Sequence, residues 1–307
     1  MIIGIDIGGT SIKFGVIDAD FRVVYRESAA TKTDGTDLDI VAQLKEVCLR
    51  LKAAYPVRCI GIGSPGTIDT ARGICVRAGN LPYRNTPMRD LLQEAVGLPV
   101  VIANDATCAI CAECYAGIGK EYRNFIMFTL GTGVGGGIVL DGKPYRGRND
   151  SAGEFGHTLL VRDGLLCKCG RRGCLEQYAS VTALIRQTRE AAAQNPNSLL
   201  ADRCRAGVNG QTVFDAAQAG CPVAQKVVEQ YAKNISDGIH SLCRAFAPEA
   251  VVIGGGVTAQ GEALLSPIRT ELALPIPVCF TALGNDAGMI GAAITAAELT
   301  AYPHNQE

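Results

Sequence analysis

The chain of 307 residues is long enough for two domains, each around a core of its own. Hydrophobic residues make up 48% and charged residues 19%, which is a globular composition, and the net charge of −1 speaks against nucleic acid or a membrane as a partner. No apolar run is long enough to span a membrane, and the N-terminal residues have no basic segment typical of a signal peptide. We therefore expect a cytoplasmic protein with reduced cysteines.

Residues 1–8 predict a buried strand, which a Gly-Gly-Thr turn connects to further strands at 11–18 and 21–28. Apolar residues at positions 40, 41, 44, 47, 48 and 51 have the spacing of an amphipathic helix. Two short apolar strands follow at 58–66 and 98–105, and residues 105–117 predict a helix. This first part of the chain therefore alternates between strands and helices.

A second strand–turn–strand cycle at 124–142 is similar to the first one at 4–20. Gly131-Thr132 matches Gly9-Thr10, and the strand that closes on Asp141 matches the strand that closes on Asp18. The pattern predicts a duplicated β-turn-β unit, one per domain. The alternative is that any two glycine-rich hairpins look alike.

The rest of the chain predicts helices at 179–194 and 222–247, a buried strand at 250–257, a helix at 261–273, a strand at 277–283 and a helix at 287–302. This order indicates an α/β fold with largely parallel central strands. No low-complexity linker separates the halves, and we place the boundary near 118–123. The expected domains are 1–118, completed by the C-terminal helix 287–302, and 119–286.

A cluster of metal-ligand residues follows the second cycle. His157 precedes a C-x-C-x4-C motif, which is the ligand set of a closed tetrahedral zinc site. The alternative is a disulfide pair plus stray residues; an odd number of cysteines, 13, in a reducing compartment favours the metal. We expect the other cysteines to behave as small buried hydrophobes. The thiol ligands of the motif are Cys167, Cys169 and Cys174.

Acidic residues flank this zinc motif. Glu154 lies just before the histidine and Glu176 just after the last cysteine. We expect the metal to fix both carboxylates at the mouth of a pocket, where they suit the hydroxyls of a polyol. The alternative is that both are solvated acids on a loop.

Three glycine-rich turns each follow an apolar strand: Gly8-Gly9-Thr10, Gly131-Thr132-Gly133 and Gly254-Gly255-Gly256. Such turns can present successive backbone N–H groups to phosphate oxygens. None matches a Walker A loop, and none opens a helix as a dinucleotide-binding turn does. Each turn alone suits a plain hairpin, but three of them, with Lys13 near the first, favour phosphate binding.

Asp105 follows a buried strand at the start of a helix. A carboxylate at this place can take the proton from a hydroxyl that attacks phosphorus. Its alternative role is that of an N-cap. Asn104 beside it lies at the carboxyl end of a strand, where α/β folds bind ligands, and Asn80 lies in a turn where a hydroxyl contact is plausible.

Together these residues resemble the ROK family of sugar kinases, transcriptional repressors and uncharacterised reading frames, and within it the bacterial glucokinases. The matching segments cover nearly the whole chain: DIGGTSIK at 6–13, GSPG at 63–66, GNLP at 79–82, NDA at 104–106, LGTGVGGG at 130–137, GEFGH at 153–157, CKCGRRGCLE at 167–176 and IGGGV at 253–257. The H…C-x-C-x4-C signature is highly specific to this family.

The resemblance implies a duplicated actin-like ATPase (ribonuclease H-like) fold of two domains, with the nucleotide in the cleft between them. It implies ATP-dependent phosphorylation of a hexose at the 6-hydroxyl, D-glucose above all, with Mg²⁺ and a structural Zn²⁺. Asp105 would be the general base, and Asp6 would help to hold Mg²⁺. The residues implied along the phosphates are Gly8, Gly9, Thr10, Lys13, Thr132 and Gly133; Gly254, Gly255 and Gly256 would lie near the adenosine; and Gly66, Asn80, Asn104, Glu154, His157 and Glu176 would bind the sugar hydroxyls.

The sequence leaves several alternatives open. One set concerns the substrates, with N-acetylmannosamine, allose or fructose as the hexose and polyphosphate as the phosphate donor. The other set concerns the activity: a sugar-responsive transcriptional regulator without its DNA-binding segment, or a zinc-containing scaffold or ATPase that uses no sugar. The resemblance also implies a homodimer or homotetramer.

Overall fold

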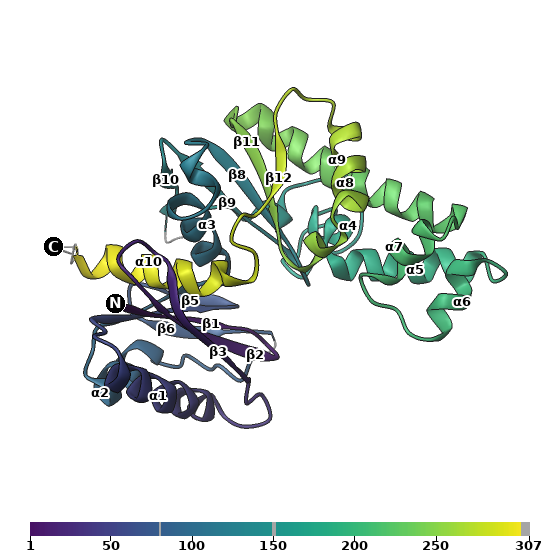
Figure 1. The fold of residues 1–307 in the computed structure, drawn as a ribbon. Coiled ribbons are helices and arrows are strands. Elements are labelled where there is room, and N and C mark those ends of the chain that lie inside the picture. Colours follow the sequence, from purple (N-terminus) through teal and green to yellow (C-terminus); the bar gives the residue numbers. More distant parts are fainter. Residues whose placement is uncertain (80, 149–151, 302–307) are drawn as a thin grey trace. The chain divides into compact units, whose positions relative to one another are not determined.

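The computed structural model describes residues 1–79, 81–148 and 152–301 (Figure 1). The chain forms two compact units: the first contains Met1–Glu121, Gly142–Ser151 and Ala282–Glu307, and the second Tyr122–Asp141 and Ala152–Thr281. Among the described residues, no helix combines the length and apolar composition that crossing a bilayer requires. The domain limits proposed from the sequence stay a prediction.

The first unit is built on a five-stranded sheet. Its strands are β1 (Ile2–Ile7), β2 (Ser11–Ile17), β3 (Val23–Ala30), β4 (Cys59–Ser64) and β7 (Val100–Asn104), in the order β3-β2-β1-β4-β7. The pairs β1–β2 and β2–β3 are antiparallel, whereas β1–β4 and β4–β7 are parallel. The parallel strands β1 and β4 are buried almost throughout, which explains why they read as continuous apolar runs.

The two faces of this sheet carry different residues because side chains alternate along a strand. Isoleucines of β1 and β4 share a core with Ile40, Leu44 and Leu51 of α1 (Asp37–Ala54) and with Leu92 of α2 (Met88–Val96). The remaining elements of this unit are β5 (Thr67–Asp69), β6 (Ile74–Arg77), η1 (Ile118–Lys120) and η5 (Gly284–Asp286).

The opposite face of the sheet contains glycines where the C-terminal helix α10 (Ala287–Ala301) packs. A Cβ at Gly4 or at its register partner Gly61 would collide with the backbone of α10. Helix α3 (Asp105–Tyr115) packs equally closely, since a Cβ at Gly291 would collide with the carbonyl of Cys108. The small residues of the last helix therefore serve close backbone packing, and Figure 1 shows α10 beside α3.

The second unit repeats the sheet topology of the first. Its strands are β8 (Phe125–Leu130), β9 (Val134–Leu140), β11 (Ala250–Gly254) and β12 (Val278–Phe280), in the order β9-β8-β11-β12, whereas the short strand β10 (Lys143–Pro144) belongs to the first unit. Here too the first hairpin is antiparallel, and the next two strands join in parallel. The repetition extends over four strands in the same order and with the same pairing directions, so the predicted duplication is confirmed and a chance likeness of two hairpins is excluded.

The second unit also contains the helices α4 (Glu176–Ala179), α5 (Val181–Gln194), α6 (Leu199–Arg205), α7 (Thr212–Gln218), α8 (Pro222–Phe246) and α9 (Glu262–Leu272), and the short turns η3 (Phe155–His157) and η4 (Gly256–Gln260). Pro222 occupies the first turn of α8, as expected. The fully buried Tyr231 of α8 donates a hydrogen bond to the carbonyl of Ala179 (2.9 Å), which fastens α4 to the core.

Candidate functional site

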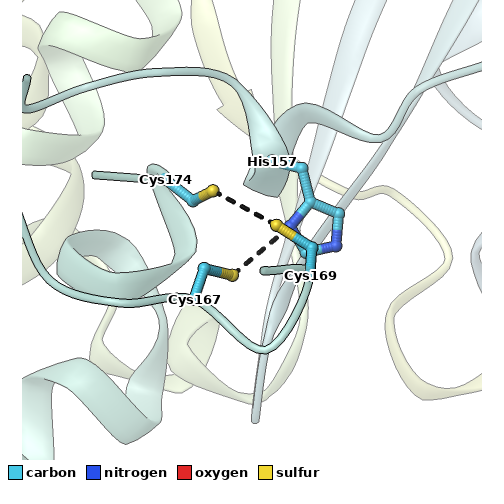
Figure 2. A group of neighbouring side chains, drawn as sticks. All are labelled: His157, Cys167, Cys169 and Cys174. Atoms are coloured by element: carbon cyan, nitrogen blue, oxygen red, sulfur yellow. Dashed lines mark hydrogen bonds between the residues drawn. The ribbon is translucent and has the colours of Figure 1, made fainter. Parts of the chain in front are cut away.

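The predicted metal ligands meet in the second unit. One ligand atom from each of His157, Cys167, Cys169 and Cys174 lies within 4.8 Å of the others (Figure 2). The Cys167 Sγ to His157 Nδ1 distance is 3.7 Å and the Cys169 Sγ to Cys174 Sγ distance is 3.6 Å. A zinc ion with Zn–S bonds of about 2.3 Å needs neighbouring sulfurs about 3.8 Å apart. The four side chains therefore fit a tetrahedral zinc.

Two glycines shape the loop that carries the thiols. Gly170 and Gly173 have φ values of +89° and +80°, a region that favours glycine. A Cβ at Gly173 would also collide with the carbonyl of Val161. The N–H of Gly170 donates to the carbonyl of Cys167 (3.0 Å), which closes the turn between the first two thiols. The sequence thus folds into the cluster through local turns.

The two flanking carboxylates lie next to this cluster. Glu176 begins α4 two residues after the last thiol, and its Oε2 accepts a hydrogen bond from Val134 N (3.1 Å) at the start of β9. Glu154 Oε2 lies 3.9 Å from Nε2 of His157, whose Nδ1 faces the thiols. When Nδ1 binds a metal, Nε2 carries the proton and can donate it to a hydrogen bond. Glu154, His157 and Glu176 are therefore held in one part of the second unit.

The turn Gly131-Thr132-Gly133 connects β8 to β9 beside Glu176. Gly131 N donates to the Gly133 carbonyl (3.0 Å), and the Thr132 carbonyl accepts from Thr182 Oγ1 (2.7 Å). A Cβ at Gly133 would collide with the Glu176 carboxylate. A side chain at this position would therefore displace the Glu176 carboxylate from its place beside the turn.

The third glycine turn follows β11. Gly255 has a φ of +96°, and a Cβ there would collide with the carbonyl of Leu130. Gly256 opens η4, and a Cβ there would meet no atom within 4 Å. Gly254 ends the strand itself. Of the three, Gly255 is the one whose backbone demands glycine.

In the first unit, Gly8-Gly9-Thr10 forms the hairpin turn between β1 and β2. Gly8 N donates to the Ser11 carbonyl (2.9 Å), and the Gly8 carbonyl accepts from Thr31 Oγ1 (2.7 Å). Thr10 is exposed at the tip of the turn. Thr31, the residue that follows β3, therefore holds the turn, since its N–H also donates to the carbonyl of Thr10 (3.1 Å).

Lys13 lies opposite Asp6 in the β1–β2 register. Its Nζ is 3.5 Å from Asp6 Oδ2 and donates to the carbonyl of Asn285 (3.0 Å). Desolvation of the half-buried Asp6 raises the pKa of its carboxyl, and the Lys13 ammonium opposes that rise. A Cβ at Gly288 would collide with the same carboxylate.

Asn285 and Gly288 were missed by sequence reasoning. Asn285 lies 272 residues along the chain from Lys13. The only hint in the sequence is the run of small residues at 287–302. It predicts that this helix packs closely, but it does not say which residues the helix contacts.

Asn104 and Asp105 lie where β7 meets α3. Asn104 is the N-cap: its Oδ1 accepts from Ala106 N (2.9 Å), and its Nδ2 donates to the Gly66 carbonyl (3.1 Å). The expectation that Asp105 is the N-cap is therefore wrong. Asp105 is the first helical residue, although its Oδ1 also accepts from Ala106 N (2.9 Å). Asn104 occupies the capping position, so Asp105 occupies the first position within the helix.

The environment of Asp105 disfavours its charged form. Burial raises the pKa of the Asp105 carboxyl, the Ala106 N–H lowers it, and the nearby Asp6 carboxylate raises it again. Asp6 pairs in register with Gly63 of β4, which pairs with Ala103 of β7, so both acids lie at the carboxyl edge of one sheet. Two carboxyls that interact at such an edge are typical of a catalytic or metal-binding place.

The predicted site residues fall into two sets, one per unit. The first unit holds Asp6, Gly8, Gly9, Thr10, Lys13, Gly66, Asn104 and Asp105, and the second holds Thr132, Gly133, Glu154, His157, Glu176, Gly254, Gly255, Gly256 and the three thiols. Asn80 lies outside the described residues. Within each unit the predicted residues gather at the glycine turns and strand ends, not over the whole surface.

The duplicated sheets, the glycine turns and the paired acids define a class of protein. A solved ROK glucokinase from Streptomyces griseus, in complex with glucose and AMPPNP, matches this chain with a TM-score of 0.81 and 36% identity, over 96% of this chain and 99% of that one. The fold is accordingly the α/β, actin-like ATPase fold of sugar kinases.

The family follows from two further comparisons. The ROK family model matches residues 2–298. The glucokinase of Streptomyces coelicolor is 37% identical over 312 residues, which cover 97% of this chain and 98% of that protein. An N-acetylmannosamine kinase of Yersinia pestis is 33% identical over 301 residues, covering 96% and 97%. This chain belongs to the ROK family.

Proposed function

We propose that this protein transfers the γ-phosphoryl group of ATP to the 6-hydroxyl of a hexose, with D-glucose as the substrate. The observation that carries the proposal is the pair of interacting acids, Asp6 and Asp105, at the carboxyl edge of the first sheet. The similarity to glucokinases supports ATP and glucose as the substrates. Glycine turns in both units supply the backbone groups that bind phosphate oxygens.

In the proposed reaction Asp105 is the general base. As the bond from O6 to the γ-phosphorus forms and the bond from that phosphorus to ADP breaks, the O6 proton passes to the Asp105 carboxylate. Asn104 positions this carboxylate because it caps α3 and is tied to Gly66. Gly66, Asn80, Asn104, Glu154, His157 and Glu176 are proposed to bind the sugar hydroxyls.

Asp6 is the residue proposed to hold Mg²⁺. Hard carboxylate oxygens suit this ion, and Asp6, whose Oδ2 lies 3.5 Å from Lys13 Nζ, would hold it and supply negative charge there. The ion would offset the charge of the phosphates. Lys13 would add a second positive charge beside the turn Gly8-Gly9-Thr10.

The cluster of one histidine and three cysteines is proposed to bind a structural zinc ion. Its donor set and spacing fit four-coordinate zinc and leave no position open for a substrate. Bound zinc would hold the loop that carries His157 and the start of α4. It would thereby fix Glu154 and Glu176 for sugar binding.

The proposed location is a reducing cytoplasm, which agrees with the odd number of cysteines, 13, and with the proposed cysteine-rich zinc site. The proposed assembly is a homodimer or homotetramer. Light scattering of the purified protein measures this oligomeric state directly.

A coupled assay tests the proposed activity. We expect ADP to form when ATP, Mg²⁺ and glucose are all present, together with an equal amount of glucose 6-phosphate. Hydrolysis of ATP at the same rate without sugar would contradict the proposal and would favour an ATPase that uses no hexose.

The relative that phosphorylates N-acetylmannosamine makes this sugar the second candidate. A panel of glucose, N-acetylmannosamine, allose and fructose separates the candidates, because the same polar groups can bind several hexoses and pocket shape decides among them. We expect the highest kcat/KM with glucose.

A further inference from the structure

The chain passes between the two units at four places. Three of them lie wholly within the described residues: Glu121–Tyr122, Asp141–Gly142 and Thr281–Ala282, hereafter the three joints. Any reorientation of one unit against the other requires backbone rotation at such passages. The hydrogen bonds beside the joints therefore decide where the chain can bend.

Glu113 fastens two of the joints on the side of the first unit. It lies in α3 with 0% exposure, and its Oε2 accepts from Ile118 N (3.2 Å) and Ala282 N (3.1 Å), while Oε1 accepts from Leu283 N (3.0 Å). Ala282 is the first residue after the third joint, and Ile118 lies shortly before the first joint. A carboxylate this deeply buried is tolerated because backbone donors satisfy it.

Short hydrogen bonds also hold the joints on the side of the second unit. Glu249 Oε2 accepts from Arg123 N and Asn124 N, both at 2.7 Å, just after the first joint. Asn124 Oδ1 accepts from Asp141 N (2.9 Å), just before the second joint. The N–H of Thr281 donates to a carbonyl of β11 (3.0 Å), just before the third joint. Each joint thus has a fastened residue within two positions on this side.

We propose that Glu113 is a positioning residue for the phosphoryl transfer, because it confines bending of the chain to the joints. The inference rests on the proposed function, in which residues of both units bind the hexose. A sharply defined hinge limits the orientations that the units can adopt, and so raises the fraction of molecules able to bind sugar. Loosening the hinge lowers that fraction and weakens apparent affinity.

The substitution Glu113→Gln tests this role. An amide has one acceptor oxygen, so at least one of the three backbone donors loses its partner and faces an NH₂ group. We expect the KM for glucose to rise roughly 3- to 10-fold, with kcat within about twofold of the parent value. A purely structural role would instead reduce the amount of folded enzyme, which lowers the measured kcat and leaves KM unchanged.

Glu121→Gln is the matched control. Glu121 is exposed beside the first joint, so the variant makes the same change of charge at the surface, and we expect its KM to equal that of the parent. Gly117→Ala is a second test, because its Cβ would collide with the Glu113 carboxylate and displace it without removing its charge. We expect this variant to raise KM in the same direction.

Hydrogen exchange tests the clamp, that is, the hydrogen bonds by which Glu113 holds the backbone amides beside the joints. This measurement does not depend on enzymatic activity. In Glu113→Gln we expect the Ala282 and Leu283 amides to exchange at least about tenfold faster, and amides in the centre of β11 to be unchanged. Unchanged exchange would overturn the clamp, and faster exchange with an unchanged KM would overturn its role in positioning. A parent protein without glucose turnover would refute the proposed function alone, since exchange would still test the clamp.

Discussion

The carboxyl group of Asp105 lies at the carboxyl edge of the first sheet, where we propose that it acts as the base for the attacking hydroxyl. It is half-buried at the first residue of α3, with Asn104 capping the helix beside it. Burial and the Asp6 carboxylate both raise its pKa, while the Ala106 N–H opposes them. A raised pKa makes the carboxylate a better proton acceptor than an exposed aspartate, at the cost of needing a higher pH to ionise.

This shift predicts the pH dependence of the reaction. Only ionised Asp105 can accept the O6 proton, so kcat/KM should fall on the acid side with an apparent pKa above the ordinary aspartate value of 3.8. A pH profile of glucose phosphorylation measures it. The interpretation fails if kcat/KM stays flat down to the ordinary value.

The raised pKa of the Asp105 carboxyl also makes the stability of the fold depend on pH. A carboxyl whose pKa is higher in the folded than in the unfolded protein stabilises the fold below its unfolded pKa. This stabilisation is lost as the pH rises through the folded pKa. At neutral pH the charge on Asp105 therefore opposes folding, and Asp105→Asn, which keeps an acceptor for Ala106 N, should be at least as stable as the parent.

At Gly255 the requirement of the backbone for glycine can be tested by a single substitution. Its φ of +96° and its contact with the Leu130 carbonyl leave no room for a Cβ. We expect Gly255→Ala to lower the free energy of unfolding by about 1–3 kcal/mol. Its neighbour Gly256 has open space around the Cβ position. Gly256→Ala should therefore change the free energy of unfolding by no more than about 0.5 kcal/mol. Urea unfolding of both variants distinguishes them, and equal effects would contradict the assignment.

Among the elements, the loop at 157–174 depends most on its proposed metal. Cys167 and Cys174 are buried, but the large apolar side chains Leu159 and Leu166 of the same loop are exposed, so hydrophobic burial contributes little to holding the loop. Metal binding in such a site contributes directly to folding. The sequence motif was sufficient to identify this element, because all four ligands are close in the chain.

The zinc proposal predicts one zinc ion per chain and a lower melting temperature after chelation. Cys167→Ser should lose the metal and lower the melting temperature, because a structural zinc site needs all four ligands. Cys204→Ser, which removes a half-buried thiol outside the cluster, should keep the zinc. Elemental analysis and thermal unfolding check both variants. A metal-free parent whose melting temperature ignores chelators would refute the site.

Element positions were predictable where periodicity is strong. The spacing at 40–51 predicts α1, which runs from Asp37 to Ala54, and Pro222 marks the start of α8. The cap of α3 was mispredicted because Asn104 and Asp105 are both good N-caps, and local propensity does not choose between them. Tertiary bonds such as Glu113 to Ala282 join residues 169 positions apart and leave no local signal.

At the scale of the molecule, duplication organises both fold and candidate site. The similarity between two short hairpin sequences predicted it, and the same order of four strands in both units establishes it. Each copy places a glycine turn between its first two strands, at Gly8-Gly9-Thr10 and at Gly131-Thr132-Gly133. Most candidate residues were predictable because ligand sites in α/β folds gather at such turns and strand ends. Asn285 and Gly288 were not, because only the folded chain brings them to Lys13 and Asp6.

The most direct test of the central claim is the turnover of Asp105→Asn beside its affinity for glucose. We expect kcat for glucose-dependent ADP formation to fall about 10²- to 10⁴-fold, the usual contribution of a general base. Glucose binding, measured by calorimetry, should change only modestly, and Asp34→Asn, an exposed aspartate in the same unit, should keep full activity. Near-normal turnover of Asp105→Asn would contradict the account.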